Sequence, residues 1–577
     1  MAKLDASKPQ RLIDRQALSL TALAIGWVAL LSWIGFGWQL GSVGLVDETE
    51  PLFAEAARQM VETGDWVTPY FNGVTRFDKP PLVYWLMAVG FHLFGVSEWT
   101  VRLPSALSAA GLTGFGFYVL RRFGQLAVGQ RPGAALWTAV VGAAAIALNP
   151  ETIAWARIGV SDMLLSACVG SALLSFFLGY AQPEYPHRQA VWYYAGYVFM
   201  ALAVLAKGPV GLVLPGLTII SFLLYLGKLR EGLRELRLLR GGLLFLAIAL
   251  PWFILVTLAN GEAYLDSFFG YHNFQRFTSV VNRHAAPWFF YFLVVTIGFL
   301  PWSGFLPLAI FRLKFWRVQH WRRLPRSQHL GLFALVWFAV VFLFFTASVT
   351  KLPSYVLPLM PAAGILVGLT WSDYLSQPRR LGWGFWASAW ANIALFLGLS
   401  AIALYSPNWM GNDPTMPNLP HLARASGIFT RAAVIWGMAA IAGCVLVILR
   451  RAVWLWSVNL IAIAAFVLLT IMPAFQLADS LRQQPLQQIA TAVAVEQQRN
   501  EPVVMVGFMK PSLVFYSQRR VNYIGDPAAV AGELADSPSD SFLLVGHPEE
   551  VAATLQPGQT QEVLLQKGTY QLARVHR

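Results

Sequence analysis

Long apolar runs recur along most of this 577-residue chain, and short polar segments separate them. A helix needs about 20 apolar residues to cross the hydrocarbon core of a bilayer, and most of these runs approach that length. The pattern predicts about thirteen spans, at residues 17–38, 101–121, 133–149, 161–181, 191–206, 209–227, 240–259, 288–312, 331–347, 354–374, 385–405, 430–449 and 453–475. It therefore indicates an all-α polytopic membrane protein over residues 1–477.

A fourteenth apolar run, 80–96, is shorter and contains His92. If this run does not cross the membrane, the basic loops all fall on the same side as the N-terminus; they contain Arg121 with Arg122, residues 228–240, 312–326 and 377–380, and Arg450 with Arg451. Lys and Arg concentrate in cytoplasmic loops, so 80–96 is expected to lie along the interface or dip into it. The extracytoplasmic face then receives residues 39–100, 150–160, the break near 207, 260–287, 348–353, 406–429 and the tail from about 476.

Composition agrees with a membrane protein, since 56% of the residues are hydrophobic and only 12% are charged, against about 25% charged in soluble domains. The net charge of +13 would also fit a nucleic-acid-binding protein. However, the basic residues cluster in short loops, where membrane topology explains them. The two cysteines, Cys168 and Cys444, lie inside apolar runs and indicate neither a disulfide framework nor a thiolate metal site. The first apolar run is long and lacks a small-residue cleavage site, so we expect an uncleaved first span.

The tail, residues 478–577, has a different pattern. The stretches EPVVMVGF, SLVFYS, RRVNYI, DSFLLVG and TYQLARV predict short strands, and DPAAVAGELA predicts a helix between them. This alternation indicates a small α/β domain outside the membrane. It contains no catalytic constellation, and a role in acceptor recognition or in capping the membrane domain is the working hypothesis.

The first outer loop begins with acidic residues directly after the first span. From Pro51 onward, Leu52, Phe53, Ala56 and Met60 recur at helical spacing, with Glu55, Arg58 and Glu62 on the other side, so the loop predicts an amphipathic helix lying on the membrane. Asp47 either caps this helix or serves a function as a carboxylate held at the bilayer boundary. Glu48 and Glu50 are expected to be solvated.

Two lysines on the outer face each precede proline. In RFDKPPL, the prolines fix the backbone after Asp78 and Lys79, and in KLPSY, Lys351 is followed by proline and by Tyr355. A lysine held at this depth can bind a phosphate as a compact point charge, or it can extend to the lipid headgroups.

Further ionisable residues border the predicted spans. Asp162 follows Arg157 at the start of a span, where it either caps the helix or serves a function. Lys207, in AKGP, is interpreted as part of a turn between two helices. The segment GYHNFQRF places His272 and Arg276 in an outer loop.

Together these residues put four cations and three acids on one outer face: Arg58, Lys79, Arg276 and Lys351 with Asp47, Asp78 and Asp162. Converging cations favour an anionic lipid phosphate, and a nearby carboxylate suits an acid–base or orienting role. The sequence contains no GxxxxGK[ST], no GxGxxG after a strand and no HExxH. A substrate already activated on a lipid would fit this pattern better than a nucleotide.

Five segments, in this order, resemble one known family: DETEPLFAEAARQM, GDWVTPYFNGVTRFDKPPLVYWL, ARIGVSDMLL, HNFQRF and KLPSYVLPLMP. The chain resembles the bacterial aminoarabinose (lipid A) transferase and its wider glycosyltransferase family, related to the protein O-mannosyltransferases, over most of residues 15–375. The resemblance implies a GT-C fold and transfer of a sugar from an undecaprenyl-phosphate donor at the periplasmic face of the inner membrane. It implies a lipid A-type or other cell-envelope acceptor.

The resemblance also implies roles for individual residues. Asp47 matches the candidate catalytic acid and Asp162 a second active-site acid. Lys79 and Arg276 are expected on the lipid phosphate, Lys351 and Tyr355 match the KLPxY segment, and Arg58 is grouped with these donor-binding residues. Glu48, Asp78 and His272 are supporting residues.

No cofactor is required by this chemistry, although some members of the family place a divalent metal near these groups. Asp78 and His272 would be the metal-binding candidates here. Because Asp78 replaces a glutamate and Asn273 stands at the family's histidine position, a metal is not expected. Two alternatives stay open: a protein O-mannosyltransferase-like enzyme with a protein acceptor, and a transporter of polyprenyl lipids or sugars. A transporter would keep its ionisable groups near mid-membrane and often shows inverted repeats, neither of which the sequence displays.

Overall fold

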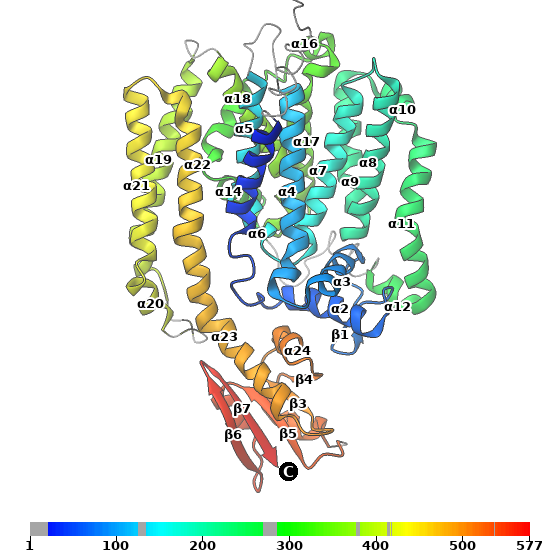
Figure 1. Cartoon of the computed structure of the whole chain (residues 1–577), viewed down its shortest axis with the longest axis vertical. Helices are drawn as coiled ribbons and strands as arrows, with labels where there is room; N and C mark the ends of the chain where they lie inside the picture. Colours follow the sequence, from blue (N-terminus) through cyan, green and yellow to red (C-terminus); the bar gives the residue numbers. More distant parts are fainter. Residues whose placement is uncertain are drawn as a thin grey trace, which may run out of the picture.

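The computed structural model describes residues 21–124, 134–268, 286–376, 381–411, 413, 416, 418–535 and 537–576. These residues form a bundle of long helices and a smaller α/β unit at one end of it (Figure 1). The helix α23 (Met472–Glu496) runs from the bundle into the α/β unit, so the expected domain boundary at residue 478 falls within a continuous helix.

Nine helices among the described residues are long and apolar enough to cross a membrane, or up to eleven spans if each of two bent helix pairs counts as one. The nine are α4 (Glu98–Phe123), α7 (Ser161–Tyr180), α8 (Pro186–Lys207), α11 (Leu238–Asn260), α17 (Leu330–Ala347), η5 with α18 (Pro353–Leu359 and Met360–Ser376), α19 (Trp383–Tyr405), α21 (Ile428–Ile448) and the run from η8 through α22 and η9 to α23 (Ala452–Trp454, Leu455–Phe466, Val467–Ile471). Two shorter apolar helices, Thr21–Gly37 and α9 (Val210–Leu226), occupy two further predicted spans. The helical membrane architecture is confirmed, and the number thirteen stays a prediction.

Two helix pairs are bent, and one of these bends lies within a predicted span. The run 288–312 was expected to be one span, but α14 (Phe290–Gly298) and the following helix, η3 with α15 (Trp302–Phe305 and Leu306–Phe311), meet at 110°. Pro301 stands at this break and has no N–H to continue the helical ladder. The second bend, of 61°, separates α5 (Ala134–Ala147) from α6 (Pro150–Ala156), where the Asn149 side chain accepts from Thr152 N at 2.9 Å and caps α6.

The elements of the first outer loop gather at the end of the bundle that carries the α/β unit. They are α2 (Glu50–Thr63), the hairpin β1–β2 (Tyr70–Phe71 and Val74–Thr75) and α3 (Leu82–Phe94), with α12 (Glu262–Leu265) beside them (Figure 1). The basic helices α10 (Leu229–Glu235) and α16 (Val318–Arg323) lie at the opposite end. The position of α3, which has only 13 residues, agrees with an interfacial segment rather than a span.

The helix α2 differs from the expected surface helix because both of its faces are packed. Phe53 stacks on Tyr84 of α3 on one side, and α24 (Pro511–Ser517) of the α/β unit packs on the other. Glu55 is fully buried and Arg58 is only 6% exposed. Their charges are accommodated because Arg58 donates to Glu55 at 2.6 and 2.7 Å.

The α/β unit contains a five-stranded sheet in the order β4-β3-β5-β7-β6. The strands are β3 (Val503–Val506), β4 (Val521–Ile524), β5 (Ser541–Gly546), β6 (Thr560–Lys567) and β7 (Tyr570–His576), with the short helices α25 (Val530–Glu533) and α26 (Pro548–Thr554) between them. β3 is parallel to β4 and β5, whereas β7 is antiparallel to β5 and β6. Alternate residues of β3 face two apolar layers, one with α23 and α24 and one with α25 and α26.

Four of the five expected strands are present, but SLVFYS is the helix α24 and the strand β6 was not anticipated. A short apolar run does not by itself distinguish a strand from a buried helix. Pro511 at the first position of α24 favours the helix, because proline has the φ that a helix start requires.

Candidate active site

A cavity of about 240 Å³ opens among the ends of several helices. Its polar lining consists of Asp78 and Lys79, which precede α3, Lys207 at the end of α8, Ser348 after α17, and Ser354 and Tyr355 in η5. Its apolar lining includes Leu165 of α7, Val210 and Val213 of α9, and Phe344 and Phe345 of α17. The cavity therefore combines two cationic groups with walls suited to a hydrocarbon chain.

Asp162 and Lys207 form an ion pair beside this cavity, with 2.6 Å between Lys207 Nζ and Asp162 Oδ1. They meet because α7 and α8 are consecutive, closely packed helices joined by a short loop, so the start of one lies beside the end of the other. Gly208 has φ of +85°, a conformation that favours glycine, and it ends α8 directly after Lys207. Lys207 also lies 5.6 Å from the centre of the Tyr355 ring.

Lys79 is held at the cavity by its neighbour. Its Nζ donates to Asp78 O at 2.8 Å and lies 3.7 Å from Asp78 Oδ2. The Asp78 carboxylate also accepts from Arg76 at 2.7 Å and from the Tyr84 hydroxyl at 3.3 Å. Asp78 therefore serves here as the acceptor that orients two cations.

Two of the expected donor-binding residues lie outside the lining of this cavity. Lys351 is 7% exposed and donates to the backbone oxygens of Thr346 and Ser348, so its ammonium ties down the end of α17. Burial lowers the pKa of Lys351 from its ordinary value. Arg58 pairs with Glu55 and Glu62 on its own helix.

Asp47 lies against the α/β unit rather than in the lining of the cavity. Its Oδ1 accepts from Ser512 N at 3.1 Å and its Oδ2 from Ser512 Oγ at 2.6 Å. Burial raises the pKa of Asp47, while the two bonds from Ser512 and the positive charges of Lys510 and Arg482 act against that rise. Glu48, in contrast, is 70% exposed and lies 3.8 Å from Lys510 Nζ.

A buried ion pair fixes the segment that leads to Asp47. Arg102 of α4 donates to both oxygens of Glu50 at 2.9 Å, and it also donates to the carbonyl oxygens of Leu40, Val43 and Gly44. Glu50 was expected to be solvated, but it is fully buried because α4 and the turn at residue 159 cover it.

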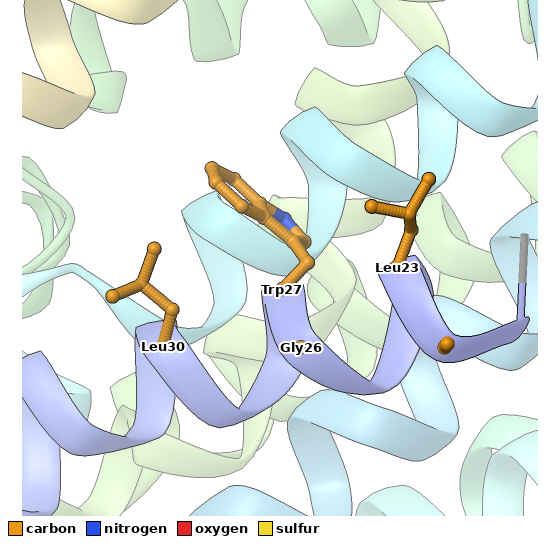
Figure 2. A pocket seen from close by; sticks show the side chains of 5 residues that line it. Leu23, Gly26, Trp27 and Leu30 are labelled. Atoms are coloured by element: carbon orange, nitrogen blue, oxygen red, sulfur yellow. The ribbon is translucent and has the colours of Figure 1, made fainter. Parts of the chain in front are cut away.

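Two other cavities are apolar. One of about 330 Å³ lies between residues 39–46, α6 and the α22–α23 region. Another, of about 610 Å³, is a shallow hollow on the helix Thr21–Gly37, where Leu23, Trp27 and Leu30 project from one face (Figure 2). Although this hollow is the largest of the three, its lining contains no titratable group. It is therefore suited to contact with lipid chains and not to catalysis.

Two of the expected site residues, His272 and Arg276, lie outside the described residues. Within the described part of the chain, no three His, Cys, Asp or Glu residues gather as a metal site. Asp78, the other metal candidate, makes the contacts given above.

Comparisons with known proteins match two parts of the chain to glycosyltransferase families. Residues 78–255 match the family described as dolichyl-phosphate-mannose-protein mannosyltransferase, and residues 496–577 match the C-terminal domain of the cyanobacterial RgtA-type glycosyltransferase. The crystal structure of ArnT from Cupriavidus metallidurans bound to undecaprenyl phosphate superposes with a TM-score of 0.77 and 25% identity, covering 96% of this chain and 98% of that one. Over nearly its whole length, the chain is therefore similar to an ArnT-like glycosyltransferase.

Two curated relatives, both called undecaprenyl phosphate-alpha-4-amino-4-deoxy-L-arabinose arabinosyl transferase, are 31% identical to the chain. The alignment with the Shewanella sediminis protein covers 65% of this chain and 64% of the relative, and that with the Aeromonas salmonicida protein covers 62% of each. The chain thus spans a little less than two thirds of the length of these relatives. The similarity to ArnT and the apolar helices together indicate a multi-pass inner-membrane protein.

The mannosyltransferase-family match at residues 78–255 includes Lys79, Asp162 and Lys207, whereas Ser512 lies in the separate C-terminal match. Sequence reasoning interpreted Lys207 as part of a turn and did not anticipate Arg102 or Ser512. An ionisable residue between two apolar runs is a signal for function that could have identified Lys207. Ser512 carries no such signal, because its partner Asp47 is 465 positions away.

Proposed function

We propose that the chain is an integral membrane glycosyltransferase that moves a sugar from an undecaprenyl-phosphate donor to a lipid A-type or other cell-envelope acceptor. The observation that carries this proposal is the cavity in which Lys79 and Lys207 lie beside apolar walls. An anionic headgroup on a prenyl chain matches both parts of that lining. The names of the curated relatives make 4-amino-4-deoxy-L-arabinose the first sugar to test.

The proposed active site faces the periplasm. The basic segments 228–240 and 312–326 lie at the end of the bundle opposite the α/β unit (Figure 1). Lys and Arg in short loops concentrate on the cytoplasmic side. The cavity, Asp47 and the α/β unit would then lie on the outer side, where a lipid-linked donor supplies the activated sugar.

In the proposed reaction, an acceptor oxygen forms a bond to the anomeric carbon of the sugar while the bond from that carbon to the lipid phosphate oxygen breaks. The electron pair leaves with the phosphate, whose negative charge grows. Lys79 and Lys207, with Arg276 as the resemblance implies, stabilise that charge. Asp47 accepts the proton of an acceptor hydroxyl or orients an acceptor phosphate, and attack from the face opposite the departing phosphate inverts the anomeric centre. Asp162 holds Lys207 in place.

The test is to incubate the purified full-length protein with a panel of undecaprenyl-phosphate sugars and either a lipid A-type or a peptide acceptor. We expect release of undecaprenyl phosphate that depends on the acceptor lipid and is abolished in Asp47→Asn and Lys79→Ala. Transfer to the peptide alone would favour the O-mannosyltransferase-like alternative, to which the match at residues 78–255 belongs. Movement of intact donor across proteoliposomes without cleavage would instead establish a transporter.

A further inference from the structure

The segment that carries Asp47 is held mainly by side chains and not by regular secondary structure. Three consecutive backbone N–H groups, of Gly44, Leu45 and Val46, donate to Asp479, Tyr516 and Glu50 at 2.6, 2.9 and 2.8 Å. The first two acceptors come from α23 and α24. The position of this segment therefore depends on how the α/β unit docks.

Tyr516 connects the segment to the membrane bundle. Its hydroxyl accepts from Leu45 N and donates to Glu98 Oε1 of α4, both at 2.9 Å. The approach at Gly44 is so close that an added Cβ would lie 3.1 Å from the Gln483 Cβ and 3.4 Å from the Tyr516 oxygen. The docking surface of α23 and α24 is thus fitted to residues 44 and 45.

Ser512, also on α24, contacts the Asp47 side chain directly. Its backbone N–H and its hydroxyl donate to different oxygens of Asp47, so rotation of the carboxylate about its last torsion is fixed. An ionised carboxylate has about four acceptor positions, and two donors leave about two of them for an acceptor substrate. This arrangement fixes the direction of Asp47 and leaves it able to accept a proton.

We infer that Ser512 is a positioning residue for sugar transfer, so that the α/β unit completes the active site by holding Asp47 in its working orientation. The inference rests on the proposed function, because it requires Asp47 to act on the acceptor. It differs from a role of the α/β unit in acceptor recognition or capping, because the bond from Ser512 affects the chemical step.

The Ser512 hydroxyl should also affect how transfer depends on pH. Donors to an ionised carboxylate favour the charged form, so loss of the Ser512 hydroxyl should raise the Asp47 pKa. The charged groups that act on Asp47 are Lys510 and Arg482, and the phenols of Tyr523 and Tyr570 also lie within electrostatic range of it. All four groups remain in Ser512→Ala. A shift of the acid limb, the part of the pH–rate profile in which activity falls at low pH, would therefore report on the hydroxyl.

The experiment measures transfer by full-length Ser512→Ala, Ser512→Thr and Ser517→Ala in lipid nanodiscs. Ser517 is a matched control on the same helix, because its hydroxyl donates to Leu513 O and not to the outer loop. For Ser512→Ala we expect kcat to fall roughly tenfold to a hundredfold, as a bond to a charged group implies, with the donor KM within twofold of wild type and the acid limb at higher pH. Ser512→Thr should restore both, and Ser517→Ala should match the wild type.

The inference would be overturned if Ser512→Ala kept the wild-type kcat and the wild-type acid limb. It would also be overturned if Ser512→Ala lost folded protein while the acid limb of the remaining activity was unchanged. Tyr516→Phe provides a second measurement, since it removes the hydroxyl that holds Leu45 N and should also lower kcat. Asp47→Asn separates the two proposals. Activity in Asp47→Asn would remove Asp47 from the proposed function, whereas an inactive Asp47→Asn with a normal Ser512→Ala would overturn only the positioning role.

Discussion

Replacement of Arg102 by methionine tests whether a buried ion pair fixes the loop that leads to Asp47. Arg102 is 2% exposed and makes five hydrogen bonds, two to Glu50 and three to the carbonyl oxygens of Leu40, Val43 and Gly44. In Arg102→Met, the buried Glu50 carboxylate keeps the hydrogen bonds from Val46 N–H and Gly159 N–H but loses its cation. Removing one partner of a buried pair costs about 3–5 kcal/mol, because the remaining charge is uncompensated.

The assay is the free energy of unfolding in mixed micelles, measured beside transfer activity. Arg157→Met is the matched control, since Arg157 donates to the carbonyl oxygens of residues 35, 38 and 39 but leaves no buried acid behind. Its expected loss is smaller, roughly 1–2 kcal/mol. Adding Glu50→Gln to Arg102→Met should recover part of the stability by removing the buried charge. A loss below about 1 kcal/mol in Arg102→Met, or no recovery in the double variant, would refute the reasoning.

Three further predictions concern separate parts of the chain. Lys207→Ala should lower undecaprenyl phosphate release by roughly a hundredfold because it removes a cation from the cavity, and Lys207→Arg should retain more activity; equal losses in the two variants would contradict a charge effect. Lys510→Gln should move the acid limb of transfer to higher pH, because Lys510 lowers the Asp47 pKa; a limb that does not move would argue against Asp47 as the titrating group. Burial raises the Glu501 pKa, but Gln498 N–H and Arg574 outweigh it and the net pKa is lowered. The stability that Glu501 gives to the sheet should therefore be present above its ordinary pKa and be lost as pH falls through the lowered pKa of the folded state. Hydrogen exchange of β3 and β7, measured as a function of pH in the wild type and in Glu501→Gln, can detect this loss.

The membrane bundle could be predicted from the sequence because hydrophobicity alone specifies where a helix can cross lipid. Length and apolar character predicted the positions of the long helices, and the basic loops predicted that residues 80–96 lie at the interface. The break in 288–312 was missed because the run is apolar on both sides of Pro301, and hydrophobicity does not show that the helix axis changes direction there. The helix α24 was mistaken for a strand because a seven-residue apolar segment fits either structure.

The candidate site was only partly predictable, because its contacts join distant segments. Lys79 and Asp162 were identified from their position at the border of apolar runs, and both lie at one end of the bundle. Glu50 was expected to be solvated because the sequence does not show that Arg102, 52 positions later, comes to cover it. Residues that bind through tertiary contacts have no local pattern that separates them from surface polar residues.

The residues proposed to carry out the transfer are held by two different parts of the molecule. The cations come from the bundle, where Lys207 is held by Asp162 and Lys79 by Asp78. The carboxylate of Asp47 is oriented instead by Ser512 of the α/β unit. Because a displacement of about 1 Å between reacting groups can cost about a hundredfold in rate, transfer requires these two parts to stay in register. The connection that keeps them in register is α23, a single helix that leaves the bundle and packs on the sheet (Figure 1). A flexible linker in its place would allow the α/β unit to bind without orienting Asp47, so the proposed active site depends on the continuity of α23.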